Sequence, residues 1–144
     1  MCKRGLAKTP FLFILGSGMP ACRIMDTPEQ ILRTAYRAFN TRNIAQALGL
    51  MHPEVDWPNG MEGGRVRGHK AVHEYWTRQW KVVDPHVDPV GFSSDAAGRT
   101  IVDVHQVVRE LHGKVVLDRM VRHSYVIENG LILSMEIDES GNAE

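Results

Sequence analysis

The stretch from Arg99 to Ile137 constrains the fold most, because it is typical of three consecutive antiparallel strands. Val, Ile, Leu and Tyr dominate this stretch, and these residues favour pleated backbone. The pattern predicts strands over about 100–111, 115–127 and 131–137, with turns at His112-Gly113 and at Glu128-Asn129-Gly130. An Asn-Gly dipeptide between apolar runs is the strongest short-range hairpin signal. Strands of this length normally coil, so we expect a curved sheet.

Side chains along a strand alternate between its two faces, and this period of two defines a candidate site. One face of the first two long strands is rich in polar groups: Asp103, His105, Val107 and Arg109, with Asp118, Met120, Arg122 and Ser124. The other face carries Val102, Val104, Gln106 and Val108, with Leu117, Arg119, Val121, His123 and Tyr125. Neither face is wholly apolar. The pattern therefore predicts a sheet covered by helices on one side and by a partner chain or solvent on the other.

Helical periodicity precedes these strands. Thr27-Pro28-Glu29-Gln30 predicts a helix start with a capping box, and a shorter helix is expected from Asn43 through Met51, ended by His52-Pro53. Short strands are expected at 55–57 and 65–67, then a helix over about 69–80 and an edge strand over 87–92. Helices segregated from an antiparallel sheet indicate an α+β domain.

A length of 144 residues indicates one domain, which we place at 25–138 between an N-terminal extension, 1–24, and a tail, 139–144. The extension is either a signal-like segment or, as the plainer interpretation, an over-extended start or a disordered tail. It contains both cysteines, Cys2 and Cys22, so the body has no disulfide framework. A cytoplasmic location is predicted, with secretion or lipid anchoring only if residues 1–22 are a genuine signal.

Composition excludes several classes of partner and cofactor. Seventeen basic and seventeen acidic residues cancel, so no global field points to nucleic acid. No apolar run approaches the length of a membrane span. No phosphate-binding or dinucleotide-binding motif is present, so no cofactor is expected. His69 and His73 have metal-ligand spacing, but no third ligand is placed nearby, so no metal site is predicted.

Several short segments, taken in order, resemble one known fold family: 27–29, 39–40, 50–55, 68–72 and 125–135. Their order and spacing resemble the nuclear transport factor 2-like superfamily and, within it, the SnoaL-like proteins. The resemblance implies a cone-shaped, curved antiparallel or mixed sheet closed by three helices in the N-terminal half, the cystatin-like roll. It also implies a pocket inside the cone and often a homodimer formed through the sheet.

The ketosteroid isomerases of this superfamily provide a test, because they use an Asp base with a Tyr and a protonated Asp as oxyanion donors. Aligned with this chain, the base position falls on Trp57, with Asp56 one residue earlier on the opposite strand face. The Tyr position falls on Ala35, beside Tyr36, and the acidic donor falls on Arg122. None of the three roles is kept at its place, so the isomerase mechanism is not inherited.

The same alignment predicts that His105, Asp103, Arg122 and Asp118 converge as catalytic residues in one cavity. The ligand-binding residues predicted around them are Trp57, Trp76, Tyr36, Met120 and Val107. His105 beside a carboxylate could move a proton, and Arg122 could hold an enolate or carboxylate. The prediction is a cofactor-free isomerase, cyclase or dehydratase acting on a small apolar or aromatic molecule. The alternatives are a non-catalytic binder of a small apolar ligand, or a dimeric assembly module whose charged face is an ion-paired interface.

Overall fold

The computed structural model describes residues 26–138, and the predicted extension at 1–24 and tail at 139–144 lie outside them. Its elements follow in chain order as α1 (Pro28–Asn40), α2 (Ile44–Gly49), β1 (Met51–Pro58), β2 (Arg65–Arg67), α3 (Gly68–Trp80), β3 (Val83–Ser94), β4 (Thr100–Glu110), β5 (Val115–Glu128) and β6 (Leu131–Asp138).

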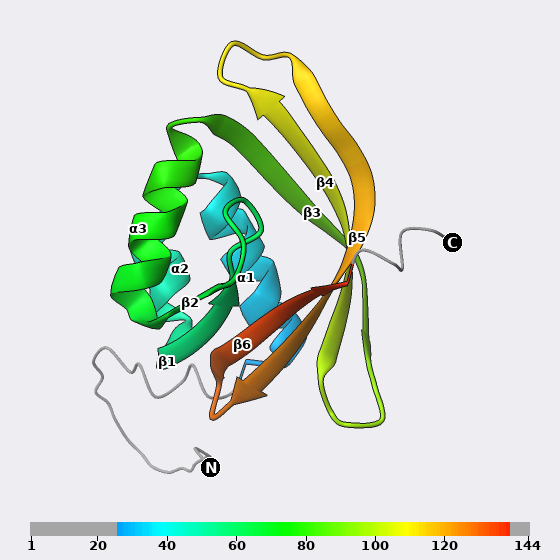
Figure 1. The fold of residues 1–144 in the computed structure, drawn as a ribbon. Coiled ribbons are helices and arrows are strands. Elements are labelled where there is room, and N and C mark those ends of the chain that lie inside the picture. Colours follow the sequence, from blue (N-terminus) through cyan, green and yellow to red (C-terminus); the bar gives the residue numbers. More distant parts are fainter. Residues whose placement is uncertain (1–25, 139–144) are drawn as a thin grey trace, which may run out of the picture.

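The strands form one six-stranded mixed sheet in the order β2-β1-β6-β5-β4-β3. Only the β1–β6 pair is parallel among the strand pairs of the described residues. The sheet is strongly curved, and the three helices lie on its concave side (Figure 1). This arrangement confirms the predicted α+β fold, a curved sheet with three helices from the N-terminal half. The predicted edge strand is also confirmed, because β3 lies at one end of the sheet.

The hairpin turn between β5 and β6 shows why the Asn-Gly signal was informative. Asn129 and Gly130 both have positive φ angles, 53° and 78°. Two successive positive φ values match the right-handed twist of the flanking strands, and Asn and Gly adopt them at least cost. The turn fixes the pairing of Glu128 with Leu131.

The start of α1 also follows its sequence signature. The hydroxyl of Thr27 accepts a hydrogen bond from the Gln30 backbone N–H at 3.1 Å, and the Gln30 side chain accepts one from the Thr27 N–H at 2.8 Å. This capping box satisfies two backbone donors at the helix end. The apolar stripe of the helix buries Ile31 and Leu32, which are at most 1% exposed, in the core on the concave side of the sheet.

The predicted boundary between the second helix and the first strand is wrong by several residues. The helix ends at Gly49, and β1 already begins at Met51. Tertiary pairing overrides the local stop signal here, because Ile132 donates to the Leu50 carbonyl at 2.9 Å and Met51 pairs with Ile132. Pro53 is tolerated within the strand because the β1–β6 register is irregular between Met51 and Asp56.

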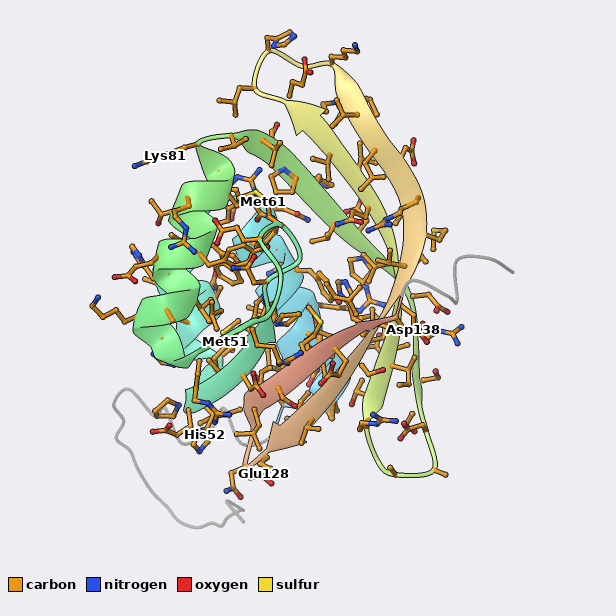
Figure 2. The ribbon with its side chains drawn as sticks, viewed as in Figure 1. Met51, His52, Met61, Lys81, Glu128 and Asp138 are labelled. Atoms are coloured by element: carbon orange, nitrogen blue, oxygen red, sulfur yellow. The ribbon has the colours of Figure 1, made fainter. Side chains whose placement is uncertain are left out.

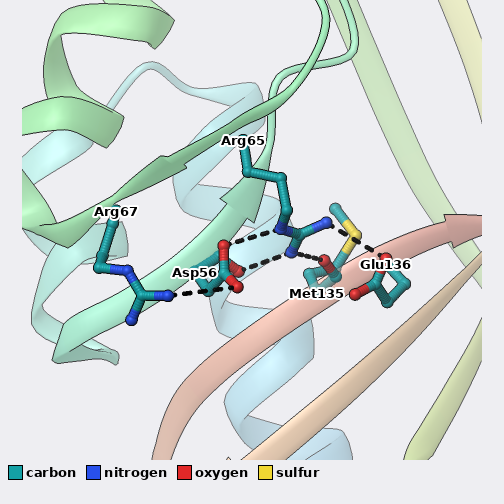
Figure 3. A network of polar contacts seen from close by, with 5 residues as sticks. All are labelled: Asp56, Arg65, Arg67, Met135 and Glu136. Atoms are coloured by element: carbon teal, nitrogen blue, oxygen red, sulfur yellow. Dashed lines mark hydrogen bonds and ion pairs between the residues drawn. The ribbon is translucent and has the colours of Figure 1, made fainter.

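One arginine reinforces the antiparallel pairing of the three-residue strand β2 with β1. The Arg65 guanidinium donates to Asp56 of β1 at 2.7 Å, to the Met135 carbonyl of β6 at 2.7 Å and to Glu136 at 3.2 Å (Figure 3). Arg67 lies 3.9 Å from the same aspartate. Because Arg65 crosses two strands, it anchors the end of the loop that leads from β1 to β2.

Candidate functional site

A cavity of about 300 Å³ lies between the helices and the inner face of the sheet. Its walls are mainly apolar and aromatic, and the edge-to-face rings of Trp57 and Trp76 are 5.7 Å apart. The polar side chains that line it are Tyr36, Tyr75, Gln79, Gln106, Arg119, His123 and Tyr125. No Asp or Glu is among the lining residues. An apolar cavity with a few fixed polar groups is the usual form of a small-molecule site.

The buried polar centre of the cavity is a chain of three side chains from α1 and β5. The Tyr125 hydroxyl donates to the Tyr36 hydroxyl at 2.8 Å, and the Tyr36 oxygen lies 2.7 Å from Nδ1 of His123. Tyr36 and His123 also stack, with their ring planes 12° apart. All three residues are at most 6% exposed, so every polar atom in the group needs a partner.

Burial keeps all three groups of this chain neutral. Burial lowers the pKa of the His123 imidazole to about 4, because the charged ring would lose its hydration. Burial, reinforced by the neighbouring Tyr125, raises the pKa of Tyr36 well above its usual value, and burial also raises the pKa of Tyr125. At neutral pH the centre therefore consists of hydrogen-bonding dipoles without a net charge.

The hydrogen-bond order favours one neutral tautomer of His123. Since Tyr125 donates to Tyr36, the Tyr36 hydroxyl hydrogen is used best when it points to Nδ1. A neutral imidazole that accepts at Nδ1 carries its hydrogen at Nε2. Within residues 26–138, Nε2 of His123 has no hydrogen-bond partner, and this atom is not fully buried. Nε2–H is therefore a donor that a molecule in the cavity can reach.

A second polar group lies further along the same strand. Arg119 pairs across the sheet with Gln106, and its Nε donates to the Gln106 side-chain oxygen at 3.0 Å. The guanidinium is permanently charged, and it is the only fully charged side chain among the residues that line the cavity. Arg119 is partly buried, whereas His123 is 6% exposed. The charged group is therefore closer to water than the imidazole is.

The loop between β1 and β2 covers part of the cavity. It is closed by hydrogen bonds between Asn59 and the two glycines Gly63 and Gly64, and it places Met61 beside α3 (Figure 2). Met61 lines the cavity, and its backbone N–H donates to the Tyr75 hydroxyl at 3.3 Å. Glu62 receives two hydrogen bonds from the Arg78 guanidinium, which fastens the loop to α3.

The four residues predicted as catalytic do come together, but on the opposite face of the sheet. Asp103 binds Arg122 at 2.9 Å, and His105 binds Asp118 at 2.7 Å. All four side chains are between 43% and 60% exposed, and none lines the cavity. The predicted strand parity is therefore wrong by one residue, which transfers the whole set from the inner to the outer face.

The predicted ligand-binding residues divide in the same way. Tyr36, Trp57 and Trp76 line the cavity, and their binding role stays a prediction. Met120 is 38% exposed and, like Val107, lies on the outer face beside the exposed set. These two positions share the parity error.

Sequence reasoning missed the residues that line the inner face of β4 and β5: Gln106, Arg119, His123 and Tyr125. The signal was present in the alternation. Val102, Val104 and Val108 share a face with Gln106, whereas the opposite face of β4 carries two charged groups and a histidine. Because the concave side of a sheet covered by helices must be the more apolar one, the three valines mark the inner face.

Comparison with solved structures places the fold among known proteins. TerC, co-crystallised with polyporic acid, is 26% identical with a TM-score of 0.68 over 80% of this chain and 92% of that one. An NTF2-like protein from Burkholderia pseudomallei is 24% identical, with a TM-score of 0.67 over 81% and 90%. A proposed polyketide cyclase from Sinorhizobium meliloti is 20% identical, with a TM-score of 0.65 over 80% and 98%.

Comparison with curated proteins finds no match. The family model of the SnoaL-like domain, in contrast, matches residues 32–135. This match spans the region from the first helix to the last strand and includes every residue of the buried Tyr–His chain. It agrees with the resemblance found in the short segments and with the six-stranded sheet. The chain belongs to the SnoaL-like domain family.

Proposed function

We propose that this protein binds a small aromatic or cyclic carbonyl compound in the cavity and promotes an isomerase, cyclase or dehydratase step on it. The observation that carries the proposal is the buried chain from Tyr125 through Tyr36 to Nδ1 of His123. It orients a neutral imidazole whose Nε2–H faces the ligand space. The cavity, about 300 Å³, is at the lower end of the range for small-molecule sites.

The chemistry assigned to His123 is stabilisation of negative charge on oxygen. A C–H bond next to the substrate carbonyl breaks, the proton passes to water, and the electron pair moves to the carbonyl oxygen as an enolate. That oxygen accepts the hydrogen bond from Nε2–H, which is already aimed and needs little reorganisation. With a pKa of about 4, His123 is a poor base at neutral pH, so its role is donation rather than proton removal.

Binding is tested with the compound found in TerC and with a matched pair of histidine variants. Isothermal titration with polyporic acid should show weaker binding to His123→Gln, by about tenfold, because the aimed donor is lost. His105→Gln should bind as the unchanged protein does, since His105 lies on the outer face. If His105→Gln weakened binding and His123→Gln did not, the binding site would instead lie at the residues first predicted, on the outer face. No binding by the unchanged protein to polyporic acid or to aromatic ketones would refute the proposal.

A non-catalytic binder is the second candidate, and one specific observation favours it. The cavity lining contains no Asp or Glu, so the wall offers no carboxylate base. The two candidates separate in proton exchange of 2-tetralone in D₂O, followed by NMR. Catalysis predicts faster loss of the ring C–H signals with the unchanged protein than with His123→Gln. Binding without any acceleration would support a carrier or sensor of the same ligand.

We also propose a homodimer formed through the outer face of β3, β4 and β5. Exposed Met120, the ion pair Asp103–Arg122 and the hydrogen-bonded pair His105–Asp118 lie on this face. Light scattering coupled to size-exclusion chromatography should give about twice the mass of the chain, and Met120→Lys should shift it toward a monomer. A monomeric unchanged protein would refute this.

No helix within residues 26–138 is long and apolar enough to cross a membrane, and a cytoplasmic location stays a prediction.

A further inference from the structure

Two polar centres on β5 divide the cavity into unlike ends. Arg119 and His123 are four residues apart on the same strand face, which corresponds to about 13 Å along the backbone. Val121 lies between them and is 3% exposed. Along β5 the cavity wall therefore has a charged end at Arg119, an apolar middle at Val121 and a neutral polar end at His123, all within the length of one small molecule.

The two ends differ in hydration as well as in charge. His123 is 6% exposed and is surrounded by the hydroxyls of Tyr36 and Tyr125, so the space beside it suits a neutral acceptor. A charged ligand group at that depth would lose its hydration without meeting an opposite charge. Arg119 is only partly buried, and a carboxylate beside it would gain a charge-assisted hydrogen bond while keeping some water.

The apolar middle sets the body of the ligand. The helices contribute Phe39 and Trp76 to the lining of the same cavity, and the two rings contact each other edge to face with their centroids 5.1 Å apart. A flat ring suits a lining that combines this pair with valines of the sheet, because aromatic side chains favour stacked or edge-on ring contacts. A flexible aliphatic chain would lose more conformational entropy on entering the same space.

We propose that the ligand is an elongated aromatic acid that carries a neutral carbonyl at the end opposite its carboxylate. Arg119 binds the carboxylate near the outer part of the cavity, and Nε2–H of His123 binds the carbonyl oxygen inside. Arg119 is thus a specificity-determining and positioning residue, remote from the reacting carbonyl. This inference rests on the proposed function, since it assigns the substrate class of the same cavity.

Matched probes separate the two contacts. We would titrate 4-acetylbenzoate and its longer analogue 4′-acetylbiphenyl-4-carboxylate, each beside the corresponding primary amide and the corresponding ethyl compound without the ketone. The unchanged protein should prefer acid to amide by about tenfold or more, because a hydrogen bond to a charged group is lost in the amide. The unchanged protein should also bind each ketone more tightly than the corresponding ethyl compound. Whichever of the two ketone acids binds more tightly then indicates the distance between Arg119 and His123.

Variants then assign each preference to a residue. Arg119→Gln should abolish the preference for the acid and keep the preference for the ketone, whereas Arg119→Lys should restore part of the former. His123→Gln should do the opposite. Arg109→Gln is the matched control, because it removes the same charge from the exposed outer side of β4. Circular dichroism and thermal unfolding of each variant confirm that the fold is intact.

The outcomes distinguish this inference from the proposed function. Equal binding of acid and amide by the unchanged protein, or an acid preference that survives Arg119→Gln, would overturn the assignment of Arg119. If neutral ketones still bound and His123→Gln weakened that binding, the proposed function would stand without a carboxylate site at Arg119. If no probe bound, and polyporic acid did not bind either, both proposals would fail together.

Discussion

The two faces of the β4–β5 hairpin use the same kinds of residue in opposite ways. On the inner face, His123 is hydrogen-bonded to a tyrosine, and burial lowers its pKa to about 4. On the outer face, His105 is bound to Asp118 in a pair whose side chains are 43% and 60% exposed. Depth in the protein, more than residue type, thus decides whether a histidine is a buried neutral dipole or an exposed partner of a carboxylate.

The largest effect should come from placing a charge on the inner face. Val104 is completely buried, so Val104→Asp would leave a carboxylate without water or a partner and should destabilise the fold by about 4 kcal/mol or more. Val116 is 50% exposed, and Val116→Asp should change stability by less than about 0.5 kcal/mol. Urea unfolding measures both. Equal effects of the two substitutions would contradict the assignment of the faces.

The pH dependence of stability should report the inner histidine. The pKa of His123 is about 4 when folded and near 6.5 when unfolded, so between these values the unfolded chain binds the extra proton. The contribution of the neutral imidazole to the free energy of unfolding is therefore fully present above pH 6.5. This contribution falls as the pH drops toward 4, by about 3 kcal/mol in total.

The comparison of variants isolates this term from other acid-sensitive groups. His123→Phe should remove that part of the pH slope of the unfolding free energy, whereas His105→Gln leaves His123 untouched and should preserve it. Urea unfolding at several pH values between 4 and 8 provides the measurement. A slope that is the same in His123→Phe and in the unchanged protein would show that the ring is not buried in its neutral form.

A smaller effect is expected from the hydroxyls that hold the imidazole. Tyr36 is the middle of the chain, and Tyr36→Phe removes both the acceptor of Tyr125 and the donor to His123. The Tyr125 hydroxyl lies 3.5 Å from Nδ1 of His123, so the two groups left by Tyr36→Phe can partly pair with each other and the cost should be about 1 to 3 kcal/mol. Tyr125→Phe, which removes only the terminal donor, should cost about 1 kcal/mol. Thermal unfolding of both variants and of the double variant tests the order. Additive effects would mean that the hydroxyls are not coupled.

The architecture could be predicted from the sequence because its signals are local. The capping box at Thr27, the Asn129-Gly130 turn and the long β-branched runs each specify a neighbouring segment of backbone. The start of β1 at Met51 could not be read in this way. It depends on pairing with Ile132, which is distant in the sequence.

The site was missed for a different physical reason. The shared face of Asp103, His105, Asp118 and Arg122 was anticipated from the strand alternation, because residues that face each other across a hairpin point to the same side. Which face points inward depends instead on where the helices pack, and a shift of one residue inverts it. A polar cluster drew attention to the outer face, although Val102 and Val104, both completely buried, mark the inner one. Polar residues on an exposed face need no function to explain them.

The smallest effect should be the coupling across the outer face. The guanidinium of Arg122 lies 2.9 Å from Asp103, and both side chains are nearly half exposed. A double-mutant cycle with Asp103→Asn and Arg122→Gln should therefore give only about 0.2 to 1 kcal/mol in the monomer, and less at high salt. The same cycle measured above the dimerisation concentration sharpens the comparison. A coupling of about 2 kcal/mol or more there would mean that the pair has lost its water, as a second chain packed on this face would require.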